Sequence, residues 1–504
     1  MSSRTPPLRR PPLFALLVAS GASFALFLYR YRTVPDGLVN DSAEEALRGL
    51  LLVEQRRLEV ITFVLGNSAE TLWLYVLGMS ATIIGPSVLA VVLPSALAAA
   101  AVVLLVALTV ESLDSGVPPW IPVVLAAGSP WLLHYARSGF RAIAAPLFLA
   151  ATAYLLARAA RTPARLGGFV ASGAAAGLSV YAYTACRILP LALALTFAVL
   201  IARDREWLRR AAAAAAGFAA VSIPNLVFLC AHPREFFGRG SYVFVGSLAD
   251  RAANFAAVLL LPFHYLDRYR FVAGPGGSFD TDGTSATLTA GGLEPVPALV
   301  GIFFALGLVL ALKNRRDPAT IFLALTLVLS GLLLGPAGPS LTRFLLAVPA
   351  LVIFASFGVA TLARTPLTRA AGAAILIAIG AHALTSYFRI LGSGGKDAAP
   401  FAGSAATAMG ERARATFANG PVLCIVTESA NVVRYLAHGT PVTVVEFYQR
   451  PFDPREARPA RDVRTLFVEA NPRLDAWRPE GWAEASRDSR FRILVPAVTP
   501  PTGP

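Results

Sequence analysis

The chain has 504 residues, of which 56% are hydrophobic and 15% charged, and its mean hydropathy is +0.61. Soluble proteins are about half apolar and about a quarter charged, so this composition excludes an ordinary soluble globule, and it also excludes intrinsic disorder. The net charge of +14 does not indicate nucleic-acid binding, because the basic residues, nearly all arginine, stand in short clusters between apolar runs. That arrangement is typical of charges that orient membrane helices.

The first element is an apolar run over 13–28, preceded by Arg4, Arg9 and Arg10. Small residues at 19–22 suit a signal-peptide cleavage site, but the run continues past them, which favours an uncleaved anchor. The basic flank predicts a cytoplasmic N-terminus and an external first loop over 29–86.

Further apolar runs follow along most of the chain, at 72–86, 87–110, 118–136, 140–157, 166–183, 187–202, 211–230, 252–262, 297–312, 318–335, 342–362 and 370–388. Four basic clusters between them are expected in the cytoplasm: Arg158/Arg161/Arg165, Arg203/Arg205/Arg209/Arg210, Lys313/Arg315/Arg316 and Arg364/Arg369.

That orientation decides how many runs span the bilayer. The run 72–86 reaches about 22 Å as a helix, short of a hydrocarbon core of about 30 Å, and 252–262 is shorter still. Counting either as a span would place basic clusters outside. We therefore predict an all-α polytopic membrane protein of about eleven transmembrane helices, with 72–86 and 252–262 interfacial or re-entrant. The loop 111–117 is expected inside although it carries no basic residue.

The composition changes after residue 391, where Gly392–Gly395 reads as a linker. Short apolar strands are expected at 421–427, 441–447, 463–468 and 491–498, with a helix at 429–437. These elements predict a small α/β extracytoplasmic domain over 396–504, after a membrane domain over 1–391. We expect the small domain not to be needed for the chemical step.

The first loop is acidic, with Asp41, Glu44, Glu45 and Glu70. Carboxylates at a membrane face suit a general base or a divalent metal ion. The alternative is a solvated amphipathic helix from Ala43 to Arg57, capped by Asp41 or Ser42.

Three arginines are expected at the outer face, where they run against the orientation rule: Arg137, Arg187 and Arg343. The guanidinium fork suits a phosphate, and the alternative is snorkelling to lipid headgroups. Their polar neighbours, His134, Tyr181 and Tyr183, are candidate accessory residues or interfacial belt residues.

No metal-ligand spacing occurs among the three cysteines and five histidines. Charges are almost absent from the middles of the apolar runs, which argues against an ion-coupled transporter.

These stretches together resemble the GT-C membrane glycosyltransferases, in the bacterial branch related to protein O-mannosyltransferases and aminoarabinose transferases. Gly37–Leu47 resembles that branch's first-loop Gly-Leu-x-x-Asp-Glu-Ala motif, and Ser68–Tyr75 resembles its Glu-Pro-Leu-x-x-Tyr segment. His134–Pro146 and Gly177–Pro190 match closely. The likeness extends over about 30–360 and is faint beyond.

The resemblance implies transfer of a sugar, with inversion, from a polyprenyl-phosphate donor to a lipid, glycan or protein acceptor at the outer face of a bacterial inner membrane. It implies Asp41 as base, Glu70 as its partner or as an acid near a divalent metal ion, and Arg137 and Arg187 near the donor phosphate. Ser42 departs from the motif's second acid, which Glu44 or Glu45 would replace one helical turn along. The alternatives are a flippase or polymerase that handles lipid-linked glycans, and a non-catalytic member.

Overall fold

The computed structural model describes residues 13–234 and 295–497, together with Phe236 and a few residues between 247 and 255. Short gaps remain at 65–66, 114–115, 314–316, 335–340, 363–365, 393–403, 427–428, 448–451, 454, 461, 472–473, 476 and 489. The N-terminal arginines and most of the predicted run 252–262 lie outside the described residues.

The chain forms two compact units. The first consists of Met1–Tyr29, Leu58–Trp73 and Leu93–Arg389, and the second of Arg30–Arg57, Leu74–Val92 and Ile390–Pro504. The second unit therefore combines most of the first loop with the C-terminal domain, although the two are more than 300 residues apart in sequence.

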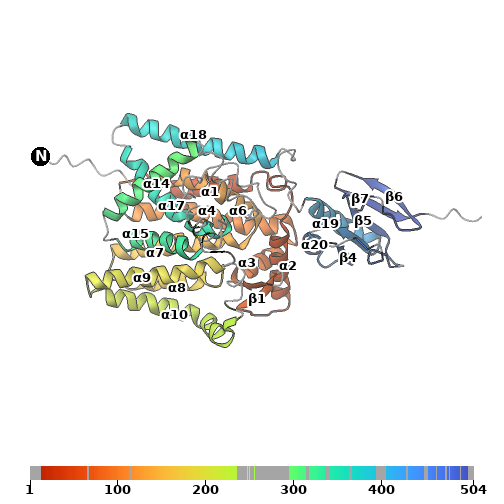
Figure 1. The fold of residues 1–504 in the computed structure, drawn as a ribbon, viewed down its shortest axis with the longest axis horizontal. Coiled ribbons are helices and arrows are strands. Elements are labelled where there is room, and N and C mark those ends of the chain that lie inside the picture. The colour runs from red at the N-terminus through yellow and green to blue at the C-terminus, as the bar shows by residue number, and fades with distance from the viewer. Residues whose placement is uncertain are drawn as a thin grey trace, which may run out of the picture. The chain divides into compact units, whose positions relative to one another are not determined.

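The first unit is a bundle of apolar helices (Figure 1). Its helices are α1 (Leu13–Leu28), α5 (Trp120–Ala127), α6 (Pro130–Ser138), α7 (Ala144–Arg161), α8 (Gly167–Ser179), α9 (Ile188–Arg203), α10 (Trp207–Ala231), α14 (Pro295–Lys313), α15 (Pro318–Leu334), α16 (Leu341–Phe344), α17 (Val348–Leu362), and most of α4 (Val88–Ser112) and α18 (Pro366–Gly392). Short 3₁₀ turns, η1 (Arg141–Ile143), η2 (Thr184–Arg187) and η5 (Leu345–Ala347), precede α7, α9 and α17. One hairpin, β1 (Ile61–Val64) and β2 (Asn67–Glu70), was not predicted.

Five helical segments are long and apolar enough to cross a membrane, judged by length and composition in the described residues: Val88–Ser112, Arg141–Arg161, Thr184–Arg203, Trp207–Ala231 and Thr342–Thr361. Shorter apolar helices include Leu13–Leu28 and Leu72–Ile84. The predicted count of about eleven spans is therefore not confirmed.

One predicted run is wrong in detail. The run 118–136 forms two helices, because the helix is interrupted between Gly128 and Pro130. The Ser129 hydroxyl accepts a hydrogen bond from the Leu132 amide at 3.2 Å and caps α6, and Pro130 occupies its first turn. A serine followed by proline is a strong start signal, so a new helix begins there.

Glycines set the closest helix crossings. A Cβ at Gly173 of α8 would overlap the backbone of Ala214 in α10, and one at Gly217 of α10 would overlap Val170 in α8. Small residues allow helix backbones to approach this closely. Close packing of this kind stabilises helix association in lipid, where the hydrophobic effect does not drive it.

Two loops expected in the cytoplasm meet at one end of the first unit. Arg161 ends α7, and its Nε and Nη2 donate to the carbonyl oxygens of Ser112 and Glu111, each at 2.7 Å. These carbonyls end α4 and have no partner within the helix, so the guanidinium caps them. The loop 111–117, which lacks a basic residue of its own, thus receives one from another loop.

The second unit is built on a five-stranded sheet. Its strands are β3 (Val422–Val426), β4 (Val442–Glu446), β5 (Thr465–Glu469), β6 (Trp482–Arg487) and β7 (Phe491–Pro496), in the order β4-β3-β5-β7-β6. Its helices are α2 (Asn40–Glu54), most of α3 (Leu72–Ile84), α19 (Ser404–Thr416) and α20 (Ala430–Leu436). β3 pairs in parallel with β4 across α20, which confirms the predicted strand–helix–strand unit; α19 and β6 were not predicted.

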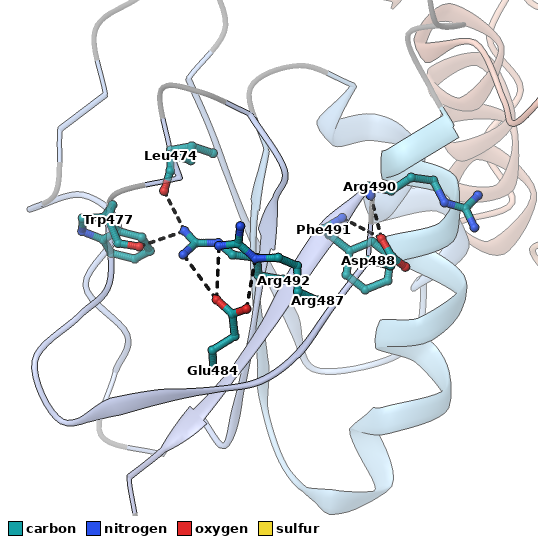
Figure 2. Close-up of polar contacts among 8 residues, drawn as sticks. All are labelled: Leu474, Trp477, Glu484, Arg487, Asp488, Arg490, Phe491 and Arg492. Atoms are coloured by element: carbon teal, nitrogen blue, oxygen red, sulfur yellow. Dashed lines mark hydrogen bonds and ion pairs between the residues drawn. The ribbon is translucent and has the colours of Figure 1, made fainter. Parts of the chain in front are cut away.

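A buried arginine fastens the loop before β6 to this sheet (Figure 2). Arg492 of β7 is 3% exposed, and its Nη2 donates to the carbonyl oxygens of Leu474 at 2.6 Å and Trp477 at 2.9 Å. Its Nη1 lies 3.7 Å from Oε2 of Glu484. The Leu474 carbonyl, which also accepts from the Trp477 amide at 3.0 Å, thus gains a charged donor, and the guanidinium ties the loop to β7.

Candidate functional site

A buried carboxylate lies at the end of the β1–β2 hairpin. Glu70 is the last residue of β2 and is 1% exposed. Its Oε1 accepts hydrogen bonds from the Thr184 hydroxyl at 2.8 Å and from Arg187 Nη2 at 3.0 Å. Its Oε2 is buried and has no hydrogen-bond partner in the described part of the chain. Such an oxygen has the capacity to accept from a ligand hydroxyl.

Local structure holds Glu70 against η2. The Leu72 amide donates to the carbonyl oxygen of Tyr181 at 2.9 Å, which ties the start of α3 to the chain just before η2. The Trp73 indole donates to the carbonyl oxygen of Gly139 at 3.2 Å. Residues 70–73 therefore connect the end of α6 with the turn before η2, two segments that are distant in sequence.

Arg187 has a second set of contacts. Its Nη1 donates to the carbonyl oxygen of Phe236 at 2.8 Å, and its guanidinium carbon lies 3.7 Å from the centre of the Phe236 ring. The side chain remains 22% exposed. A partly exposed guanidinium that is held by an acid and an aromatic ring is oriented in advance for an anionic group.

Arg137 is enclosed more completely. It is 2% exposed, donates from Nη1 to the carbonyl oxygen of Phe27 at 3.0 Å, and lies 5.1 Å from the centre of the Phe388 ring. His134, one turn earlier on α6, is also buried, and its Nδ1 lies 3.5 Å from the Tyr387 hydroxyl. Both side chains connect α6 to the helices around it.

The Tyr181 hydroxyl forms hydrogen bonds with the backbone of α10. Its hydroxyl donates to the carbonyl oxygen of Val221 at 2.8 Å and accepts from the Asn225 amide at 3.1 Å. These two groups are four residues apart, so the hydroxyl bridges the acceptor and the donor of one helical turn, next to Pro224. The structure thus gives Tyr181 a specific packing role.

The remaining outer-face candidates are partly or fully buried. Tyr183 is 7% exposed and lies edge-on to Phe140 with ring centres 6.4 Å apart. Arg141, which follows Phe140, is 2% exposed and lies 6.0 Å from the Tyr183 ring. Arg343 is half-buried on α16.

Three acids of the first loop, Asp41, Glu44 and Glu45, lie on α2 in the second unit. Asp41 is exposed in the first turn, Glu44 is half-buried and Glu45 is 1% exposed. The helix begins at Asn40 and ends at Glu54, earlier at both ends than the predicted 43–57. Its cap position is Val39, so the prediction that Asp41 or Ser42 caps it is wrong. A carboxylate in the first turn is nevertheless favoured by the helix dipole.

Two contacts of this site escaped the sequence reasoning. Thr184 lies three residues before Arg187, a spacing that brings both side chains to one side of a 3₁₀ turn. Phe236 lies between the predicted apolar runs 211–230 and 252–262, in a segment most of which is outside the described residues. Only the first of them had a readable signal, a hydroxyl one turn before a conspicuous arginine.

A metal centre finds no support in this geometry. Among the residues that the structure describes, no three His, Cys, Asp or Glu side chains form a group suited to a metal ion. Divalent cations such as Ca²⁺ take several oxygen ligands, and Glu70 is already paired with a cation.

Comparison with known proteins places the fold. A model of the dolichyl-phosphate-mannose-protein mannosyltransferase family matches residues 71–228. No curated protein matches the chain in sequence. ArnT from Cupriavidus metallidurans bound to undecaprenyl phosphate is 12% identical with a TM-score of 0.63, over 98% of this chain and 100% of that one. The archaeal oligosaccharyltransferase AglB from Archaeoglobus fulgidus, in complex with an inhibitory peptide and a dolichol-phosphate, is 13% identical with a TM-score of 0.52. The match covers 91% of this chain and 69% of that one.

These matches confirm the resemblance to the GT-C membrane glycosyltransferases. At such low identity the solved structures show a common fold. The stretch that matches the family model contains Arg137 and Arg187, begins directly after Glu70, and leaves out Asp41.

Proposed function

We propose that this chain is a GT-C type glycosyltransferase that moves a sugar from a polyprenyl-phosphate donor to an acceptor hydroxyl at the outer face of a bacterial inner membrane. The observation that carries the proposal is the ion pair between the buried Glu70 and the partly exposed Arg187; Arg187 lies within the family-matched region and Glu70 directly precedes it. Two proteins of the same fold are bound to undecaprenyl phosphate or dolichol-phosphate, which supports a lipid-phosphate donor.

The proposed reaction is a single displacement that inverts the anomeric centre. The acceptor oxygen attacks the anomeric carbon, and the bond from that carbon to the phosphate oxygen breaks. The acceptor proton goes to the Asp41 carboxylate, which acts as general base. The lipid phosphate leaves with the bonding electrons, so positive charge beside it stabilises the transition state.

Arg187 is the arginine that the geometry favours for this phosphate. Its guanidinium is partly exposed and is fixed from two sides, by Glu70 and by Phe236. Glu70 then has two roles: Oε1 orients the guanidinium, and the buried Oε2 is available to accept a hydrogen bond from a sugar or acceptor hydroxyl. Preorganised charge of this kind makes the largest single contribution to the rate enhancement of many enzymes.

The other candidates are assigned supporting parts. Arg137 lies 2% exposed against a backbone carbonyl and a ring, so we assign it to holding α6 in place beside the donor site. His134, Tyr181 and Tyr183 share this packing role. Arg343, half-buried on α16, is retained as a second contact for the donor phosphate.

The proposed orientation has the N-terminus and Arg161 in the cytoplasm, and Arg343 and the C-terminal domain outside. Single cysteines at 161 and 343, introduced after replacement of Cys186, Cys230 and Cys424, test it with a membrane-impermeant thiol reagent in cells with a permeabilised outer membrane. Position 343 is expected to react and position 161 only after lysis. Labelling of 161 before lysis would overturn this topology.

The activity is tested with membranes that contain the chain and a panel of radiolabelled polyprenyl-phosphate sugars. Transfer of label to a product that retains no lipid phosphate is the expected result, and NMR of the product is expected to show the anomeric configuration opposite to that of the donor. Retention of configuration would reject the single displacement. No transfer from any donor would reject the proposed function.

A further inference from the structure

The first loop and the C-terminal domain pack as one unit, and this arrangement bears on the proposed catalytic base. We propose that the C-terminal domain positions the helix that carries Asp41, with Thr407 as the principal positioning residue. This inference rests on the proposed function and replaces the sequence-based expectation that the domain is dispensable for the chemical step. No residue of the domain needs to touch the substrate, because the effect is transmitted through α2.

The first contact lies just before α2. The Leu38 amide donates to the Thr407 hydroxyl oxygen at 2.9 Å, across 369 residues of sequence. Leu38 is 1% exposed and Thr407 8% exposed, so water does not compete for this bond. Asp41 follows three residues later, in the first turn of the helix. A displacement at Leu38 therefore moves Asp41 directly.

A second contact holds the opposite end of α2. His438, just after α20, places Nε2 at 3.0 Å and 3.1 Å from the two carboxylate oxygens of Glu54, the last residue of α2. Between the two ends, α2 packs against α20 (Figure 1). The C-terminal domain thus fixes both ends and one side of the helix.

The same domain also holds the turn between α3 and α4. Arg414 of α19 donates from Nη1 to the carbonyl oxygen of Pro86 at 2.7 Å. The buried Tyr435 hydroxyl lies 3.3 Å and 3.4 Å from the carbonyl oxygen and amide nitrogen of Ser87. Burial raises the pKa of Tyr435 to about 12, so this hydroxyl keeps its proton and donates at any physiological pH.

The helices of the loop are themselves in backbone contact. A Cβ at Gly49 of α2 would overlap the backbone of Leu74 in α3, and a Cβ at Gly78 of α3 would overlap Gly49. α2 and α3 therefore move together, and the C-terminal domain holds both. Misplacement of a catalytic group by about 1 Å typically costs about 100-fold in rate, so such a support is functionally significant.

The test compares three variants in the full-length protein. Thr407→Val keeps the shape of the side chain but removes the acceptor for the Leu38 amide, and Thr407→Ser restores the hydroxyl. Thr416→Val is the matched control, because Thr416 lies on the same helix and its hydroxyl donates to the Arg412 carbonyl within that helix. Both kcat and KM for the lipid donor are measured, together with hydrogen exchange of the peptide 36–46.

Thr407→Val is expected to lower kcat about 10- to 100-fold with little change in the donor KM, and to speed exchange at 36–46 while strand β3 stays protected. Thr407→Ser and Thr416→Val are expected to behave as wild type. Unchanged kcat with faster exchange overturns the proposal, and so does lowered kcat with unchanged exchange. If Thr407→Val loses protection in β3, His438→Ala replaces it, with faster exchange expected near 48–54.

The two proposals fail in different ways. If the wild type transfers no sugar from any lipid donor, the proposed function fails, whereas exchange at 36–46 still reports whether Thr407 holds the loop. If the wild type is active and Thr407→Val matches it in kcat and in exchange, only the positioning role is rejected.

Discussion

Thr184 and Arg187 bind the same oxygen of Glu70 from a single 3₁₀ turn, at 2.8 Å and 3.0 Å. Residues three apart eclipse one another in such a turn, which has three residues per turn, so the hydroxyl and the guanidinium converge without distortion. The second carboxylate oxygen is left for another partner, and this asymmetry shapes the first prediction.

Glu70→Gln keeps the size of the side chain but removes its charge. The variant is expected to lower turnover by at least 10-fold, because Arg187 loses the carboxylate that orients it and the amide nitrogen replaces an acceptor with a donor. Steady-state kinetics with a lipid-phosphate sugar measure the effect. Glu206→Gln is the control, since that acid is exposed and pairs with Arg210 only at 3.8 Å. Equal turnover in both variants would show that Glu70 is a packing residue.

Arg187→Lys separates charge from geometry. Lysine retains the positive charge but lacks the planar fork that bonds Glu70 and the Phe236 carbonyl at once. We expect the KM for the lipid donor to rise about 10-fold or more, with a smaller fall in kcat, and Arg187→Ala to be more severe. Direct binding of the lipid phosphate without sugar checks the assignment. A donor affinity that is unchanged in Arg187→Ala would contradict it.

The sequence predicts the apolar helices and the strand–helix–strand unit because both depend on local periodicity and composition. It could not predict that α2 packs against α20, since nothing in either segment encodes a partner almost 400 residues away. The break at Ser129 was readable from its serine and proline, yet the continuous hydropathy of 118–136 obscured it. The sequence leaves Tyr181 as an accessory or an interfacial residue, because its partner in the structure is the backbone of another helix, which no local pattern encodes.

That partner makes Tyr181 a test of the helix packing. Tyr181→Phe removes the hydroxyl that bridges Val221 and Asn225 and leaves a carbonyl and an amide without their bridge. The expected loss of stability is about 1–3 kcal/mol, measured as a lower thermal midpoint in detergent. Tyr154→Phe is the control, because its hydroxyl accepts from the exposed Arg158 one turn along the same helix. Equal midpoints for the two variants would show that α10 closes its own hydrogen bond at this position.

Arg492→Met probes the buried network of the C-terminal domain (Figure 2). The variant fills similar volume but leaves the carbonyls of Leu474 and Trp477 without a charged donor. Bonds to charged groups contribute about 1.5–3 kcal/mol, so we expect faster hydrogen exchange across β5 and β7. Arg487→Met removes an exposed guanidinium that pairs with the same Glu484, and it is expected to leave exchange unchanged. Similar exchange in the two variants would assign the effect to Glu484 alone.

The last prediction concerns the proposed base. Asp41→Asn keeps the size and the hydrogen-bonding capacity of the side chain but removes its basicity. If Asp41 takes the acceptor proton, turnover falls about 10²–10⁴-fold while the lipid donor still binds, because Arg187 is intact. The capping explanation no longer competes, since the cap position is Val39. Glu59→Gln is the control, because this acid belongs to the same loop but lies beyond α2. Wild-type turnover in Asp41→Asn, with Glu45→Gln inactive, would move the base to the buried acid one helical turn along.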